Sequence, residues 1–112
     1  MADNCIFCKI VKKEIPAKIE FEDNKILAFN DINPKAPVHI LIIPKTHLES
    51  LSVMVEKEID IASKLVLTAK KIAKNKKISD FRLVFNAGQD AGMEIDHLHL
   101  HLLGGTKLGP MA

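Results

Sequence analysis

The chain has 112 residues, enough for one domain with a single buried core, and we expect one domain over residues 1–112. Apolar residues make up 47% of it, charged residues 27%, and the net charge is +2. These values give no reason to expect a membrane or a nucleic acid as partner. The first ten residues, MADNCIFCKI, lack the long apolar run of a secretory signal, so we expect a cytoplasmic protein with reduced cysteines.

The N-terminal half predicts a short helix followed by three strands. Asp3 or Asn4 is expected to cap the helix, and Pro16 marks its end or the turn after it. The apolar stripe of this helix is Ile6, Phe7, Ile10 and Val11. Strands are expected over residues 19–21 and 26–29, joined by the turn EDNK, and over residues 38–44. The last of these, VHILIIP, is almost wholly apolar and β-branched, which is typical of a central strand.

The C-terminal half predicts a long helix and two strands. The helix is expected over residues 55–74, with an apolar stripe made of Val55, Ile59, Ala62, Val66, Ala69 and Ala73, widened by Leu65 and Ile72. FRLVFN (residues 81–86) is a strand, AGQDAG is a glycine-bearing loop, and a strand with three histidines follows. One long and one short helix with about five antiparallel strands predict an α+β fold of two layers.

The histidine segment DHLHLHLLGG places three imidazoles on alternate positions. In a strand, His97, His99 and His101 share one face and the intervening leucines share the other, whereas a helix would scatter both sets. The histidines would then be about 6.7 Å apart along the backbone. The row has three interpretations: a His-rich, half-buried strand, ligands of a catalytic zinc ion, or a nucleophile with histidine neighbours. The first and third imidazoles, about 13 Å apart at the backbone, are too distant to share one zinc without a sharp bend.

The segment His-Leu-His-Leu-His-Leu-Leu resembles the signature of the histidine triad (HIT) superfamily of nucleotide hydrolases and transferases. Residues 5–47 and residues 83–105 are similar throughout to the Hint branch of that superfamily, and the Gly-Gly after the triad is typical of Hint. The resemblance implies a HIT-like fold, five antiparallel strands, and a homodimer that joins two sheets edge to edge.

The same resemblance implies a purine nucleoside 5'-phosphoramidase that forms a covalent nucleotidyl-histidine. His99 matches the family nucleophile, His101 the histidine that contacts the phosphate and the leaving group, and His39 the histidine that helps to orient the nucleophile. No catalytic cofactor is implied. Three alternatives stay open: a noncatalytic module that binds a purine nucleotide, a dinucleoside polyphosphate hydrolase, and a zinc-dependent hydrolase that uses the histidine row as ligands.

Nucleotide contacts are likewise implied by the resemblance. Asp31 matches the carboxylate that accepts hydrogen bonds from the ribose, and Asn86 matches a polar contact near the leaving group. Backbone amides of the loop from Gly88 to Glu94 would hold phosphate, Gly92 and Met93 among them. Glu94 departs from the better-known members, which carry Ser there, and its carboxylate would repel phosphate. The apolar slot for the base would consist of Ile6, Phe7, Phe29 and Ile32.

Cys5 and Cys8 have the C-x-x-C spacing of metal ligands, but a zinc site needs two more. Zinc-bearing HIT relatives, including the uridylyltransferase branch, use positions that match His47 and His97. The resemblance therefore implies a structural zinc site in which His97 serves the metal while His99 and His101 serve the phosphate. A redox dithiol and two ordinary buried thiols are the alternatives.

Overall fold

The structure is a computed structural model that describes residues 4–111. The expected helix cap at Asp3 lies outside the described residues. The elements in chain order are α1 (Ile6–Val11), β1 (Ile19–Glu22), β2 (Ile26–Asn30), β3 (Val38–Pro44), α2 (Ile59–Asn75), β4 (Phe81–Phe85) and β5 (Leu100–Gly104). Short 3-10 turns lie at Leu51–Val53, Glu56–Glu58 and Gln89–Ala91. All five expected strands and both expected helices are present, with ends that shift by a few residues.

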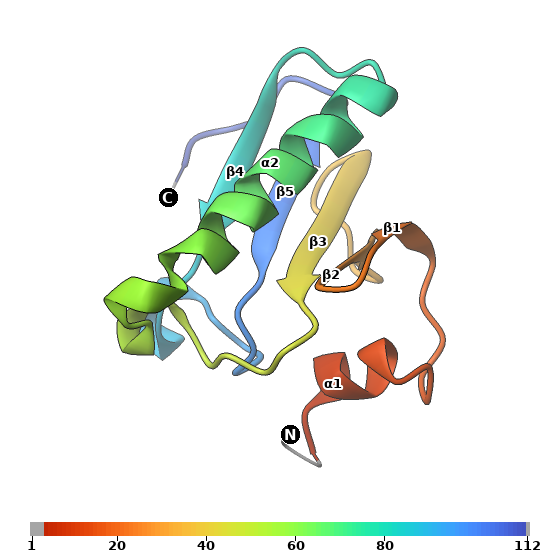
Figure 1. The fold of residues 1–112 in the computed structure, drawn as a ribbon. Helices are drawn as coiled ribbons and strands as arrows, with labels where there is room; N and C mark the ends of the chain where they lie inside the picture. Colours follow the sequence, from red (N-terminus) through yellow and green to blue (C-terminus); the bar gives the residue numbers. More distant parts are fainter. Residues whose placement is uncertain (1–3, 112) are drawn as a thin grey trace.

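The strands form one antiparallel sheet in the order β1-β2-β3-β5-β4 (Figure 1). The apolar strand β3 is central, as predicted. Its register with β5 places Leu41 opposite His101 and His39 opposite Leu103. His39 and His101 are therefore diagonal neighbours on the same face of the sheet, close enough for their side chains to meet.

Each face of the sheet carries its own hydrophobic core. On one face, α2 packs diagonally across β3, β5 and β4, and the buried leucines Leu98, Leu100 and Leu102 face it (Figure 1). On the other face, α1 packs against β2 and β3 through Phe7, Cys8 and Ile10, which contact the residues Leu27, Phe29, Leu41 and Ile43. The short helix thus covers part of the face of the sheet opposite α2.

Two details of the helices differ from the predictions. The Sγ of Cys5 caps α1 by accepting the N–H of Cys8, whereas Asn4 is exposed and makes no such bond. The helix α2 begins at Ile59 and buries Leu65, Thr68, Ala69, Ile72 and Ala73. Three residues of the predicted stripe, Val55, Ile59 and Val66, are exposed. The helix has apolar side chains on more than one side, so the pattern alone did not select the stripe that faces the sheet.

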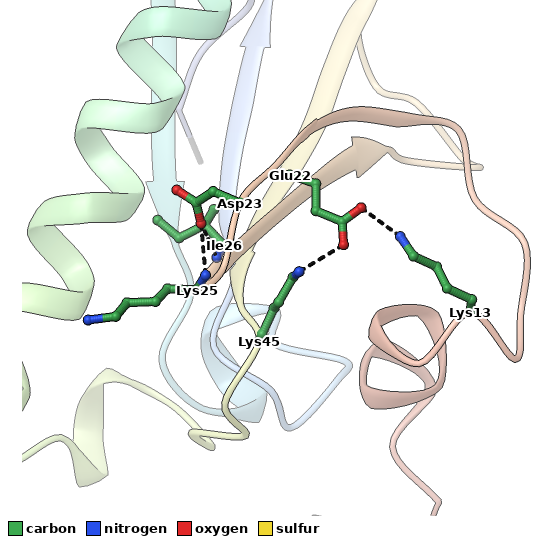
Figure 2. Close-up of polar contacts among 6 residues, drawn as sticks. All are labelled: Lys13, Glu22, Asp23, Lys25, Ile26 and Lys45. Atoms are coloured by element: carbon green, nitrogen blue, oxygen red, sulfur yellow. Dashed lines mark hydrogen bonds and ion pairs between the residues drawn. The ribbon is translucent and has the colours of Figure 1, made fainter.

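Charged side chains join the end of α1 to the sheet. Glu22 in β1 binds the ammonium groups of Lys13 at 2.7 Å and Lys45 at 2.8 Å, which follow α1 and β3 (Figure 2). The next residue, Asp23, accepts the backbone N–H groups of Lys25 and Ile26 at 2.8 Å each and so forms the β1–β2 turn (Figure 2). Both lysine ammoniums lower the pKa of the Glu22 carboxyl, but these exposed pairs add little stability.

Gly104 and Gly105 end β5, as predicted. Gly105 has φ +90°, and a Cβ atom there would lie 3.1 Å from the Cβ of Pro37. A side chain would therefore be strained by both backbone and packing. In residues 4–111, no helix is long and apolar enough to cross a membrane.

Candidate active site and metal centre

The three histidines of the triad lie on the α1 side of the sheet. Only His101 belongs to β5, while His97 and His99 lie in the segment that leads into it. The leucines between them are buried against α2, so the predicted alternation of faces is confirmed. His97 and His99 are 0% and 7% exposed, and His101 is half-buried.

His99 has one ring nitrogen fixed by the backbone. Its Nδ1 lies 2.7 Å from the carbonyl oxygen of His97. A carbonyl only accepts, so Nδ1 carries the proton and donates it. In the neutral ring, Nε2 is then unprotonated and has a free lone pair, which is what a nucleophilic imidazole requires. The Phe7 ring meets the His99 ring edge to face, with centroids 5.2 Å apart, and restricts its orientation.

His39 and His101 form a hydrogen-bonded pair whose direction is also set by the backbone. The N–H of Lys35 donates to Nδ1 of His39 at 3.0 Å, so this nitrogen is unprotonated and Nε2 carries the proton. Nε2 of His39 lies 2.9 Å from Nδ1 of His101 and donates to it. The remaining proton of neutral His101 is therefore on Nε2, which is buried and has no partner among the described residues.

That unpartnered Nε2–H lies beside the ring of His99, because the rings of His99 and His101 have centroids 5.0 Å apart. Leaving a buried donor without an acceptor costs about 1–3 kcal/mol. An oxygen of a bound phosphate would remove this cost. The pair of rings thus offers an electron pair on His99 and a hydrogen-bond donor on His101 to the same small region.

Burial favours the neutral form of His39, His97 and His101. The pKa of His101 is lowered to about 4, mainly by burial. The neighbouring His99 and His39 also lower this pKa, whereas the Asp31 carboxylate raises it. Burial likewise lowers the pKa of His39. The pKa of His97 is lowered to about 4, mainly by burial, although its hydrogen bond to Pro44 acts in the other direction. Neutral rings are the form that a nucleophilic site and a metal ligand both need.

The predicted metal ligands meet in one cluster. Cys5, Cys8, His47 and His97 each offer one ligand atom, and these atoms all lie within 4.8 Å of one another. Nδ1 of His97 lies 3.3 Å from the Sγ of Cys5 and 3.5 Å from the Sγ of Cys8, and Nδ1 of His47 lies 3.3 Å from the Sγ of Cys8. Helix α1 supplies the two sulfurs, the end of β3 leads to His47, and the triad segment supplies His97.

These residues fit a structural zinc ion. With bonds of about 2.3 Å to sulfur and 2.0–2.1 Å to nitrogen, tetrahedral geometry places sulfur and nitrogen ligands about 3.6 Å apart. The observed sulfur–nitrogen distances are close to that value. Nε2 of His97 donates to the carbonyl of Pro44 at 2.9 Å, which turns Nδ1 toward the sulfurs in the way that outer hydrogen bonds orient metal-binding histidines.

The histidine row is not arranged as a tripod around one ion. Nδ1 of His97 faces the cysteines, Nδ1 of His99 faces a carbonyl, and Nδ1 of His101 faces His39. Asp31, His39 and His101 also have donor atoms within 4.8 Å. The 2.9 Å between their two nitrogens fits a hydrogen bond better than two ligands of one tetrahedral zinc ion, which lie about 3.3 Å apart.

The expected nucleotide contacts border this centre in part. Asp31 follows β2, and its Oδ2 lies 3.4 Å from Nε2 of His39. Phe7 and Phe29 are buried with ring centroids 5.5 Å apart, edge to face. Ile6 is 40% exposed and Ile32 89% exposed, so these two side chains are accessible to a ligand, whereas the two phenylalanines are buried.

The loop before the triad uses several of its amides internally. Gly92 N–H donates to Gln89, and Met93 N–H donates to Gly88, so neither amide is available to phosphate without a rearrangement. Within residues 4–111 the N–H of Glu94 has no such partner, and the Glu94 side chain is exposed. Asn86, at the end of β4, places its side-chain amide beside Gly92. The loop therefore retains the Glu94 amide and the Asn86 side chain as donors.

Three backbone groups of the site were not predicted: the N–H of Lys35 and the carbonyls of Pro44 and His97. They decide which nitrogen of His39, His97 and His99 carries the proton. No side-chain pattern identifies such groups, because any residue type supplies them.

Comparisons with known proteins agree with this geometry. The family described as "Scavenger mRNA decapping enzyme C-term binding" matches residues 4–110. A solved histidine triad protein from Clostridium difficile superimposes with a TM-score of 0.96 at 46% identity, covering 100% of this chain and 99% of that one. The chain belongs to the histidine triad (HIT) family. Within the HIT family it is Hint-like: "Adenylylsulfatase HINT1" of Arabidopsis thaliana is 47% identical over 92% of this chain and 72% of its own length.

Other HIT relatives match over nearly their whole length. The "Purine nucleoside phosphoramidase" of Escherichia coli is 40% identical over 99% of this chain and 95% of its own. An uncharacterized HIT-like protein of Synechocystis is 49% identical over 94% and 93%. A HIT family hydrolase from Legionella pneumophila superimposes with a TM-score of 0.92 at 45% identity, covering 95% of this chain and 96% of that one.

Proposed function

We propose that this HIT protein is a nucleoside phosphoramidase, which cleaves the P–N bond of a purine nucleoside 5'-phosphoramidate to give the nucleoside monophosphate and an amine. One observation carries the proposal. Backbone contacts leave an unprotonated Nε2 on His99 and a protonated, unpartnered Nε2 on His101 at neighbouring rings. A HIT relative with the name of this activity, 40% identical, supports the choice of substrate.

In the first step, Nε2 of His99 attacks the α-phosphorus. A P–N bond to His99 forms as the P–N bond to the amine breaks, and the bonding electrons leave with the amine nitrogen. His101 donates its Nε2–H to a phosphate oxygen, on which negative charge accumulates in the transition state. Neutral His101 is a weak acid, so the amine nitrogen leaves with a proton that it already carries or that water supplies.

In the second step, water attacks the phosphorus of nucleotidyl-His99. The bond to His99 breaks, the nucleoside monophosphate leaves, and His99 returns to its neutral form with Nδ1–H bound to the carbonyl of His97. The same carbonyl stabilises positive charge on the His99 ring while Nε2 is bonded to phosphorus. No step requires a catalytic cofactor.

The remaining parts of the proposal concern binding. Asp31 would accept the ribose hydroxyls, and the base would lie against Ile6 and Ile32 with Phe7 and Phe29 behind them. Cys5, Cys8, His47 and His97 would hold zinc. The ion, when bound, supplies a fixed tetrahedral connection between α1, the end of β3 and the triad segment, and no chemistry.

A turnover panel tests the function. Adenosine and guanosine phosphoramidates, adenosine phosphosulfate and a dinucleoside polyphosphate are each supplied to the reduced protein, and nucleoside monophosphate is measured. The phosphoramidates should be the preferred substrates by kcat/KM. His99→Ala should lose on the order of a thousandfold in kcat and retain affinity for the nucleoside monophosphate, because only transition-state chemistry is removed.

Preference for the phosphosulfate or the dinucleoside polyphosphate would contradict the choice of leaving group. Binding of nucleoside monophosphate without turnover of any substrate would make the protein a nucleotide-binding module. Near-normal activity of His99→Ala would refute the role of His99.

A further inference from the structure

The carboxylate of Asp31 faces two partners. Its Oδ1 accepts the backbone N–H of Asn33 at 2.8 Å, which holds the turn after β2. Its Oδ2 lies 3.4 Å from Nε2 of His39. The side chain of Asp31 is 20% exposed and that of His39 only 4%, so the carboxylate lies between solvent and the buried pair of histidines.

The proton on Nε2 of His39 is donated to Nδ1 of His101 at 2.9 Å. Oδ2 of Asp31 lies beside the same nitrogen at 3.4 Å, at ion-pair distance, and attracts the proton electrostatically. The backbone N–H of Lys35 occupies the other nitrogen of His39, so this proton has no alternative position in the neutral ring. The charge of Asp31 acts directly on the hydrogen bond that decides which nitrogen of His101 is protonated.

We propose that Asp31 is a positioning residue that couples ribose recognition to the hydrogen bond His101 offers to phosphate. The ribose part rests on the proposed function. In the free protein, the Asp31 carboxylate competes electrostatically with His101 for the proton of His39. When ribose hydroxyls donate to the carboxylate, that competition weakens and His39 donates to His101 alone. The Nε2–H of His101 is then held toward the phosphate.

This coupling predicts an effect of ribose on the rate of turnover as well as on affinity. A carboxylate that only bound ribose would change KM and leave kcat unchanged. A carboxylate that only held the turn would act through Oδ1 and Asn33. Asp31→Asn separates these roles, because the amide keeps the shape and an oxygen for Asn33 but removes the charge that faces His39.

The first test uses the protein without nucleotide. Nitrogen-15 NMR of the imidazoles reports which nitrogen is protonated and how each ring titrates. His101 faces His99, His39 and Asp31, and His39 faces Asp31 and Lys35; of these groups Asp31 is the one whose charge raises the pKa values of both rings. Asp31→Asn should therefore titrate His101 at lower pH and raise the fraction of its neutral tautomer with Nε2 protonated, because His39 then donates to His101 without competition. Asp60→Asn, an exposed acid at the start of α2, should leave both unchanged.

The second test compares an adenosine phosphoramidate with its 2',3'-dideoxy analogue. For the native protein, loss of the hydroxyls should lower kcat about tenfold in addition to raising KM. For Asp31→Asn, the kcat ratio of the two substrates should approach one. Unchanged titration and tautomers of His101 in Asp31→Asn, or a ribose effect confined to KM in the native protein, would overturn the coupling. If the native protein turned over neither substrate, the proposed function would fail, and the NMR result would still decide whether Asp31 controls His101.

Discussion

Removal of metal should destabilise the protein without unfolding it outright. Cys8 and His97 are 1% and 0% exposed, so a zinc ion among Cys5, Cys8, His47 and His97 would be enclosed by the protein. A ligand present at a hundred times its Kd stabilises the folded state by about 2.7 kcal/mol. For a domain of this size each kcal/mol corresponds to roughly 4–5 °C, so chelation should lower the Tm by about 11–14 °C. The hydrophobic core between α2 and the sheet contains none of the four metal ligands and should keep the chain folded.

The assay combines metal analysis with thermal unfolding under reducing conditions. The purified protein should contain about one zinc per chain, and a strong chelator should lower the Tm by the amount above. Cys5→Ser and Cys8→Ser should each lose the zinc, and the chelator should then have no further effect on their Tm. Absence of zinc from the reduced protein, with a Tm that the chelator does not change, would refute the assignment of the cluster.

Three further predictions follow from burial, strain and the exposed sheet edge. Activity should be lost as the pH falls to about 4, because the pKa of His101 is about 4 and protonating His101 breaks the hydrogen bond that it accepts from His39. The free energy of unfolding, measured with urea, should also fall as the pH is lowered from 6.5 to 4. In this range the histidines of the unfolded chain bind protons, whereas the buried histidines of the folded chain stay neutral. A free energy of unfolding that does not change with pH would contradict the burial of neutral histidines. Gly105→Ala should lower the free energy of unfolding, measured with urea, by about 1–3 kcal/mol, because φ is +90° at Gly105. Gly109→Ala should lower it much less, because a Cβ atom there would have no atom within 4 Å. Equal losses of stability in the two variants would contradict the strain argument. The strand β4 lies at the edge of the sheet and is expected to pair with β4 of a second copy in a homodimer. Sedimentation should then give twice the 12.4 kDa mass of one chain, and the mass of one chain at micromolar concentration would refute the dimer.

The sequence was sufficient to predict the sheet and the side chains of the centre. Period-two alternation requires a strand to bury Leu98, Leu100 and Leu102, and this fixes the face on which the histidines lie. The C-x-x-C spacing indicated two of the metal ligands, and the resemblance to zinc-bearing HIT relatives supplied the two histidines of the cluster, whose ligand atoms lie within 4.8 Å of one another.

The remaining features depend on contacts that side-chain patterns do not contain. The stripe of α2 was misassigned because Val55, Ile59 and Val66 are as apolar as the residues that face the sheet. The cap of α1 was misassigned because a cysteine sulfur accepts the hydrogen bond that a polar side chain usually accepts. The protonated nitrogen of each histidine is set by backbone groups of Lys35, Pro44 and His97, whose positions follow only from the folded chain.

The central claim is that His99 is the nucleophile, and trapping the covalent intermediate tests it most directly. The reaction with a purine nucleoside phosphoramidate is stopped with base, because a phosphorus–nitrogen bond to histidine is labile in acid and survives in alkali. Peptide mass analysis should then place the nucleotidyl group on His99 alone, as expected for the one triad ring whose Nδ1–H is held by a carbonyl and whose Nε2 is free. A nucleotidyl group on His97 or His101, or rapid turnover with no adduct on any histidine, would contradict the account.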